Sequence, residues 1–234
     1  GNLSLSNTLP ILHRNHFVFT PCCHINDPSG ILMPDIHYLL SHGYEELRAT
    51  IDKWRLPWDA KKPKAIYRGL LINGSPYNFM DVPEDLNDHP RLRFSRLVRN
   101  IPHLVNTLGP EDHNKRTSRK TMLKYKYIID IDGFSNTWDG TFWKLYSGSV
   151  VIKQTSIWHQ WYYGGLKEWV HYVPLNNSLN NVEEAIKWCM NNDAECERIA
   201  ARAKQFVLDN FNWDEVKDIA KQKLVQYRST LYSS

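Results

Sequence analysis

A strand that ends in small polar residues is the part of this sequence best suited to chemistry. Residues 128–140 read IIDIDGFSNTWDG, so an apolar run ends at Asp132 and Gly133 and small polar residues follow. Backbone N–H groups at such a turn, helped by the positive end of a following helix, can hold a diphosphate. Residues 147–149 (SGS) form a second turn of small residues. Such loops are also common as plain turns, so both interpretations stay open.

Asp130 and Asp132 in this strand form a D-x-D pattern. Two carboxylates at this spacing can bind Mn²⁺ or Mg²⁺ bridging a diphosphate, because hard cations prefer oxygen ligands. Side chains alternate along a strand, so both carboxylates lie on one face and could equally cap the strand end. The pattern alone does not separate these alternatives.

Arg68 and Gly69, near the end of the apolar run 64–71 (KAIYRGLL), are a second candidate for phosphate binding. An arginine can donate two hydrogen bonds to phosphate oxygens, and a glycine allows close approach of the backbone. The alternative is an arginine in a surface ion pair.

Other common kinds of site are not favoured by the sequence. The ten histidines are scattered, and the four cysteines at 22, 23, 189 and 196 lack the spacing of a zinc finger. A net charge of +4 is small for a dedicated nucleic-acid-binding protein. The densest basic run, residues 113–126, could attract phosphates or be a solvated loop and helix start. No long apolar run predicts a membrane span.

The elements that must position these residues begin with short strands and helices in the first half. Apolar runs predict strands at residues 16–20 and 64–71, a strand followed by a turn within 31–40, and a loop at 21–30. Apolar residues at helical spacing predict helices over 44–54 and 91–98.

The second half has a clearer alternation of strands and helices. Strands are predicted at residues 124–132, 149–153 and 169–174, and a short helix at 141–146. Three amphipathic helices follow, over residues 182–190, 195–211 and 214–227. Alternation of this kind predicts an α/β protein with parallel sheets, and residues 109–123 mark a break between two lobes.

A long ordered motif resembles a known family. KYKYIIDIDGFSNTWDGTFWKLYSGSVVIK, followed by QWYYGGLKEWVHYVPL, is similar to glycosyltransferase family 90, which includes protein O-glucosyltransferases and capsule xylosyltransferases. The match is correctly spaced over residues 124–174. WRLPWDAKKPKAIYRG upstream, RLRFSRLV and NNDAECERIAARAKQFV also look like segments of the family, so the resemblance covers roughly residues 28–228.

The resemblance implies a GT-B-like fold, with two Rossmann-like lobes, a cleft between them and a C-terminal helix packing across. Residues 1–110 would form the acceptor-side lobe and residues 111–234 the lobe that binds the nucleotide sugar. The family is mainly inverting and largely metal-independent, so no cofactor is expected to be required, although Mn²⁺ or Mg²⁺ is not excluded. Residues that the resemblance assigns to donor binding are Arg68, Gly69, Gly133, Phe134, Ser135, Asn136, Thr137, Trp138, Asp139, Lys144 and Ser149.

The sequence departs from the family in two places. The family's protein glucosyltransferases have an arginine in the segment between loop and helix, where this chain has TWDGTF. Arg68 or Lys144 would then have to neutralise the phosphates. An inverting transferase also needs a carboxylate to deprotonate the acceptor, and Asn7 stands where the family's aspartate is expected. Either the base is Asp27 or Asp35, or the alignment slips, or the chain is inactive.

These observations predict an inverting glycosyltransferase that moves xylose, glucose or a related sugar from a UDP-sugar to a hydroxyl of a glycan or protein. The alternative is a catalytically inactive module that binds nucleotide sugars or glycans. Neither a nucleic-acid partner nor a membrane span is expected, and the absence of a signal sequence predicts a cytoplasmic microbial or viral protein. Four aromatic residues would line the cleft or pack in the core, namely Trp158, Trp161, Tyr162 and Tyr163.

Overall fold

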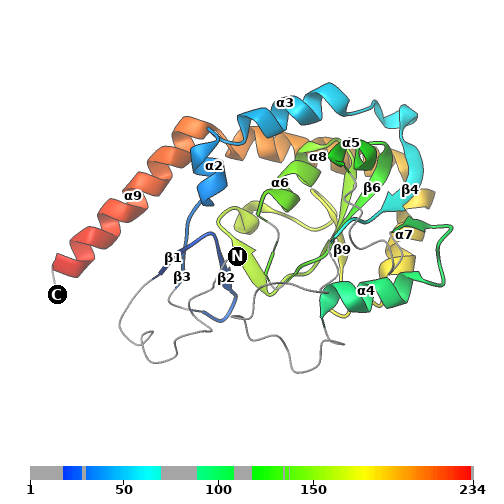
Figure 1. Cartoon of the computed structure of the whole chain (residues 1–234), viewed down its shortest axis with the longest axis horizontal. Coiled ribbons are helices and arrows are strands. Elements are labelled where there is room, and N and C mark those ends of the chain that lie inside the picture. Colours follow the sequence, from blue (N-terminus) through cyan, green and yellow to red (C-terminus); the bar gives the residue numbers. More distant parts are fainter. Residues whose placement is uncertain are drawn as a thin grey trace.

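The computed structural model of this chain describes residues 18–27, 30–69, 89–107, 118–133, 135–136 and 138–232. Its centre is a five-stranded sheet with the order β5-β4-β6-β7-β9, in which every neighbouring pair is parallel (Figure 1). The strands are β4 (Lys62–Ile66), β5 (Val105–Asn106), β6 (Tyr125–Asp130), β7 (Val150–Gln154) and β9 (Val173–Leu175). The predicted α/β class with a parallel sheet is confirmed.

Helices cover both faces of this sheet. On one face, Tyr127 and Ile129 of β6 pack in a cluster with α4 (Pro90–Val98) and α7 (Val182–Asn191). On the other face, Ile128 packs in a second cluster with α3 (Glu45–Trp54), α5 (Arg119–Met122), α6 (Trp138–Tyr146) and the later turns of α8 (Asp193–Asn210). All six residues of β6 are buried, as expected for a strand covered on both faces.

Two pairs of short strands lie outside the main sheet. β1 (Val18–Thr20) is parallel to β3 (Gly30–Leu32), and β2 (Cys22–His24) is antiparallel to β8 (Trp158–Gln160). The prediction of a loop over residues 21–30 was wrong at β2, because its backbone pairs with a strand far along the chain. The structure also forms α2 (Ile36–Leu40) where a strand and turn were predicted. The predicted strand at 169–174 begins only at Val173.

The main sheet crosses the boundary predicted at residue 110. β4 and β5 come from the first predicted lobe, yet β4 pairs directly with β6. Backbone pairing therefore places these two strands in the same sheet as β6, β7 and β9. The helix α9 (Trp213–Tyr232) reaches past the sheet toward β1 and β3, where the Lys223 ammonium donates a hydrogen bond of 2.8 Å to the Leu32 carbonyl (Figure 1). Among the residues described, no helix is long and apolar enough to span a membrane.

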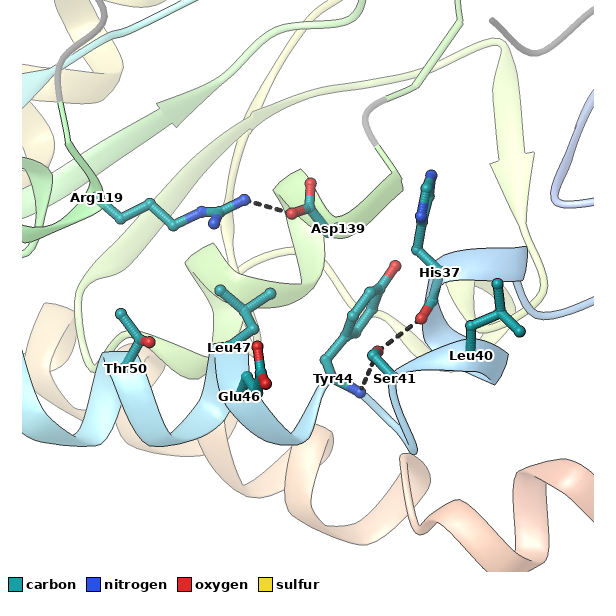
Figure 2. A pocket seen from close by; sticks show the side chains of 9 residues that line it. All are labelled: His37, Leu40, Ser41, Tyr44, Glu46, Leu47, Thr50, Arg119 and Asp139. Carbon is teal, nitrogen blue, oxygen red and sulfur yellow. Dashed lines mark hydrogen bonds and ion pairs between the residues drawn. The ribbon is translucent and has the colours of Figure 1, made fainter.

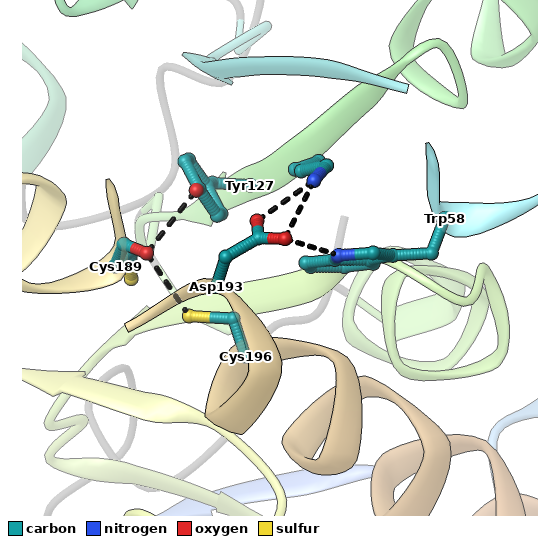
Figure 3. Close-up of polar contacts among 6 residues, drawn as sticks. Trp58, Tyr127, Cys189, Asp193 and Cys196 are labelled. Atoms are coloured by element: carbon teal, nitrogen blue, oxygen red, sulfur yellow. Dashed lines mark hydrogen bonds and ion pairs between the residues drawn. The ribbon is translucent and has the colours of Figure 1, made fainter. Parts of the chain in front are cut away.

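Polar side chains tie the helices to the amino end of the sheet. The Lys126 ammonium on β6 lies 2.7 Å from the Asp193 carboxylate, which also accepts a 3.0 Å hydrogen bond from the Trp58 indole of the 3-10 turn η1 (Trp58–Ala60) (Figure 3). The Tyr127 hydroxyl donates to the Cys189 carbonyl at 3.2 Å. These contacts fix the start of α8 and the end of α7 against β6.

Lys61 joins three elements at this same amino end. Its buried ammonium donates to the Leu123 carbonyl at 2.9 Å and to the Ser149 hydroxyl at 2.8 Å. Burial, together with the nearby charge of Arg55, lowers the pKa of Lys61 to about 8. The lysine therefore fastens the starts of β4, β6 and β7 together.

Candidate functional site

The candidate site lies at the carboxyl ends of the parallel strands, where ligands bind in open α/β sheets. Residues Tyr67–Gly69 follow β4, Ile131–Gly133 follow β6, and Thr155 follows β7. Register pairs Ile66 of β4 and Val151 of β7 with Ile128 of β6, so these strand ends are neighbours in the sheet.

The described residues between β6 and α6 make specific hydrogen bonds. The Gly133 N–H donates a 2.9 Å hydrogen bond to the Ser135 carbonyl. The buried Asn136 side chain donates at 3.4 Å to the carbonyl of Trp158 on β8. Among the residues described, its buried Oδ1 atom has no hydrogen-bond partner. The Asn136 Oδ1 atom is therefore a buried hydrogen-bond acceptor just before the N-terminus of α6.

Arg91 brings a positive charge to this loop. It belongs to the first turn of α4, which His89 caps by accepting a 3.2 Å hydrogen bond from the Arg91 N–H. A β-carbon built on Gly133 would come within 3.0 Å of Arg91 Nη2, so the guanidinium lies directly against this glycine. Burial, together with the charges of Arg91 and Arg93, lowers the pKa of His89 to about 4. At neutral pH, His89 is therefore a neutral cap beside two arginines.

Asp130 and Lys144 form an ion pair inside the protein rather than in the loop. Lys144 of α6 donates to Asp130 Oδ1, and the Thr141 hydroxyl donates to Oδ2 at 2.7 Å. Burial alone would raise the pKa of Asp130, but the charges of Lys144 and Lys153 and these hydrogen bonds bring it below its usual value. The pair anchors α6 to the end of β6, and a metal ion would have to displace these donors.

Asp132 occupies a different environment at the same strand end. Burial raises the pKa of its carboxyl, although the positive charge of Lys153 partly opposes the effect. The Asp132 N–H donates to the Gln154 side chain at 3.2 Å, which ties the ends of β6 and β7 together. Within the described residues, no group of three histidine, cysteine, aspartate or glutamate side chains is arranged to hold a metal ion.

Arg68 and Gly69 lie at the neighbouring strand end. The Arg68 guanidinium donates to the Asn106 carbonyl at 2.8 Å and to its side-chain oxygen at 2.6 Å, so it is directed toward β5. A β-carbon on Gly69 would come within 2.2 Å of the Tyr67 hydroxyl. Only glycine leaves room for this buried tyrosine, whose pKa burial raises to about 12.

Two other predicted donor residues face different directions. Ser149 precedes β7 at the opposite, amino end of the sheet, where its hydroxyl donates to the Tyr125 carbonyl at 2.8 Å. It is not brought together with Gly133. Asp139 is in the first turn of α6 and pairs with Arg119. Trp138 is the first residue of α6, while Phe134 and Thr137 lie outside the described residues.

The three candidate bases also differ in their placement. Asn7 lies outside the described residues. Asp35 is buried and caps α2; it accepts hydrogen bonds from the Tyr38 N–H at 3.0 Å and from the Tyr44 hydroxyl at 2.5 Å. Both of its carboxylate oxygens are therefore used inside the fold. Asp27 is half-buried in the turn after β2.

The aromatic segment after β7 belongs largely to the core. Tyr162 is buried, and Trp161 and Tyr163 pack against the cluster that contains α3, α6 and α8. Trp158 on β8 is half-buried and makes an edge contact with His24 on β2. Of the two alternatives for this segment, packing therefore accounts for Trp161, Tyr162 and Tyr163.

Two cations of the site were not identified as site residues from the sequence. Arg91 belongs to a correctly predicted helix, but no local pattern shows that this helix begins beside Gly133. Lys153 is buried near the end of β7, with its ammonium 4.6 Å from the ring centre of Tyr163. The only feature of the sequence that could have identified Lys153 is the position of a lysine at the end of an apolar strand.

Comparisons with known proteins agree with the sequence motif. The model of a family described as "Glycosyl transferase family 90" matches residues 19–233. Bovine protein O-glucosyltransferase 1 is 27% identical over 190 residues, which cover 80% of this chain and 46% of the bovine protein. Uncharacterized protein 035R of Invertebrate iridescent virus 3 is 31% identical over 178 residues, covering 69% of this chain and 16% of the viral protein. This chain thus spans about half the length of the bovine relative.

The solved structure of Anabaena HepE in complex with UDP-glucose aligns with a TM-score of 0.47 and 10% identity. The alignment covers 86% of this chain and 58% of HepE.

Proposed function

Because this chain belongs to glycosyl transferase family 90, we propose that it transfers a hexose or pentose from a UDP-sugar to a hydroxyl group, with inversion at the anomeric carbon. The observation that carries this proposal is the position of Arg91 against Gly133, at the turn that leads into α6. A guanidinium beside a helix N-terminus favours a bound diphosphate. The bovine relative is named as a protein O-glucosyltransferase, which supports the class of reaction.

In this proposal the diphosphate binds at the N-terminus of α6 without a required metal ion. Arg91 supplies a charged double donor, and the backbone N–H groups at the start of α6 supply neutral donors. Lys153, buried near the same strand end, adds positive charge close to the site. Lys144 acts indirectly, because its pairing with Asp130 holds α6 in place.

We propose Asp27 as the catalytic base. β2 pairs with β8, so His24 lies opposite Trp158, and the Ile25 N–H donates to the Ile157 carbonyl at 2.8 Å. Asn136, in the loop between β6 and α6 (the donor loop), donates a hydrogen bond to the carbonyl of Trp158 on this same β8. The turn that carries Asp27 therefore follows a strand pair attached to the donor loop.

The proposed reaction is a single displacement. Asp27 takes the proton of the acceptor hydroxyl as its oxygen attacks the anomeric carbon from the side opposite UDP. The bond from the anomeric carbon to the phosphate oxygen breaks, and UDP leaves with the electron pair. The acceptor is a hydroxyl group of a glycan or a protein.

A UDP-release assay with a panel of UDP-sugars, run in EDTA and again with Mn²⁺, tests the proposal. Calorimetry of UDP binding is measured on the same protein. Turnover of one donor in EDTA supports a metal-independent transferase and identifies its sugar. UDP binding without turnover of any donor favours the inactive binding module, and turnover restored by Asn7→Asp would move the base to position 7. Absence of UDP binding would overturn the proposal.

A further inference from the structure

A cavity of about 700 Å³ is lined by residues of α2, α3, α5 and the first turn of α6 (Figure 2). Small-molecule sites commonly have volumes of about 300–1,000 Å³. Asp139 in the first turn of α6 forms part of its wall and pairs with Arg119 of α5, which also lines the cavity. The cavity thus adjoins the N-terminus of the same helix to which the donor is assigned.

The backbone that carries Tyr44 into the wall of this cavity is strained. Between α2 and α3, His42, Gly43 and Tyr44 all have left-handed conformations, with φ values of 48°, 76° and 62°. Such a conformation costs a residue other than glycine about 1–2 kcal/mol, and left-handed residues normally occur singly. Strained segments of this kind cluster at ligand sites and are held there by the surrounding contacts.

Specific contacts hold the strained segment in place. The Tyr44 hydroxyl donates to the buried Asp35 carboxylate, and the Tyr44 N–H donates to the Ser41 hydroxyl at 3.1 Å. The Arg48 side chain donates to the Gly43 carbonyl at 2.9 Å. As a result, Tyr44 forms a rigid wall of the cavity, with its ring 4.8 Å from the Phe142 ring of α6. The contacts around Asp35 therefore support this wall rather than an accessible base.

The walls combine apolar surface with polar groups from several elements. Leu40 and Leu47 supply apolar surface, and the Leu40 side chain is 73% exposed. Glu46 and Thr50 supply a carboxylate and a hydroxyl along the exposed face of α3. The Arg119–Asp139 pair adds both a planar double donor and an acceptor to the lining (Figure 2). Sugar rings present this same combination of apolar C–H faces and hydroxyl edges.

The charges of the cavity exclude a nucleotide as its preferred ligand. The lining includes the carboxylates of Glu46 and Asp139, the guanidinium of Arg119, which is paired with Asp139, and the imidazole of His37. A diphosphate would meet the Glu46 carboxylate here, whereas it meets the Arg91 guanidinium beside Gly133. The cavity therefore suits an uncharged ligand with many hydroxyl groups.

We propose that this cavity between α2, α3 and α6 binds a neutral oligosaccharide, the acceptor of the sugar transfer. The binding site follows from the cavity, the strained segment that holds Tyr44 in its wall and the mixed lining, while the role as acceptor rests on the proposed function. Transfer requires the acceptor to lie beside the donor, and α6 contributes to both sites. The acceptor class is therefore a glycan rather than an unglycosylated protein side chain.

Saturation-transfer NMR with cellotriose, xylotriose and maltotriose tests binding without depending on catalysis. Thr50→Trp places a bulky side chain into the cavity from the exposed face of α3. Ala49→Trp adds the same bulk at the next position, which is exposed and does not line the cavity. We expect at least one trisaccharide to bind the unmodified protein and Ala49→Trp, and to bind Thr50→Trp about tenfold more weakly.

If the unmodified protein transferred no saturation to any of the three trisaccharides, the proposal would be overturned. Equal saturation transfer from Thr50→Trp and the unmodified protein would overturn it as well. A second matched pair replaces one carboxylate at a time, Glu46→Ala in the cavity and Glu45→Ala outside it. Weaker binding by Glu46→Ala alone supports the site, and equal loss in both variants contradicts it. UDP calorimetry on the same samples separates the two proposals, because failure of UDP binding with intact trisaccharide binding rejects only the proposed transferase function.

Discussion

The guanidinium of Arg91 lies against the α-carbon of Gly133, where a β-carbon would come within 3.0 Å of Nη2. This contact joins the first turn of α4 to the loop that leads into α6. It depends on two features at once, the absence of a side chain at Gly133 and the capping of α4 by His89. The proposed donor site can be tested at each of these residues.

Arg91→Met should weaken UDP binding by about ten- to a hundredfold, because it removes a charged double donor from the proposed diphosphate site. Isothermal calorimetry with UDP measures the effect. Arg99→Met is the matched control, since it removes the same charge at the exposed C-terminal end of α4. Equal affinities for the two variants would contradict the placement of the diphosphate.

Gly133→Ala should weaken UDP binding while leaving stability nearly unchanged. The new methyl group meets the far end of the Arg91 side chain, which can move aside by a few tenths of an ångström. Displacing the guanidinium alters the site but leaves the core intact. UDP calorimetry and urea denaturation of the same variant check the two halves of this prediction, and a large loss of stability would show that the glycine is needed for folding instead.

Asp27→Asn should lower kcat by about 100- to 10,000-fold, the usual contribution of a general base. UDP affinity should stay the same, because the turn after β2 is assigned to proton transfer rather than to the diphosphate. Asp35→Asn, by contrast, should mainly reduce stability, since this carboxylate caps α2 and accepts from Tyr44. A full loss of turnover in Asp35→Asn at unchanged stability would reverse the two assignments.

Lys144→Met should destabilise the protein by about 3–5 kcal/mol at pH 7, because it leaves the buried Asp130 carboxylate without its partner. The free energy of unfolding in urea measures this loss. The double variant Lys144→Met/Asp130→Asn removes both charges and should recover part of it. A double variant as unstable as the sum of its single changes would show that the two residues do not act as a pair.

His89 should make stability depend on pH in the mildly acidic range. The folded-state pKa is about 4, whereas the ordinary value is 6.5. As the pH falls from about 6.5 to 4, the unfolded chain binds a proton that the folded chain does not, so stability decreases.

His89→Asn keeps a capping side chain but does not titrate. Between pH 7 and pH 5, the free energy of unfolding should therefore fall less in this variant than in the unmodified protein, by a difference of up to about 2 kcal/mol. Urea denaturation at the two pH values measures the difference. The exposed residue His103 provides the control variant His103→Asn. If the stability of His89→Asn depended on pH as much as that of the unmodified protein, His89 would not be the group responsible.

Local patterns were sufficient for the elements that bury a continuous apolar stripe. All six residues of β6 are buried, and four of them are tyrosine or isoleucine, which have high strand propensity. The helices α3, α4, α7 and α8 repeat apolar residues at helical spacing. The short elements were not predictable in this way. β2 is only three residues long, and its partner β8 lies more than a hundred residues further along the chain.

The sequence by itself determined the α/β class, the family motif and the turn at Gly133, because strand and helix periodicity and glycine placement are local properties. The tertiary structure alone decided which charges meet there. It directed Lys144 into the core against Asp130 and placed Ser149 at the opposite end of the sheet, while it brought Arg91 to Gly133. The physical reason is that a charged side chain pairs with whatever the packing of distant elements places beside it, and sequence spacing does not encode that neighbour.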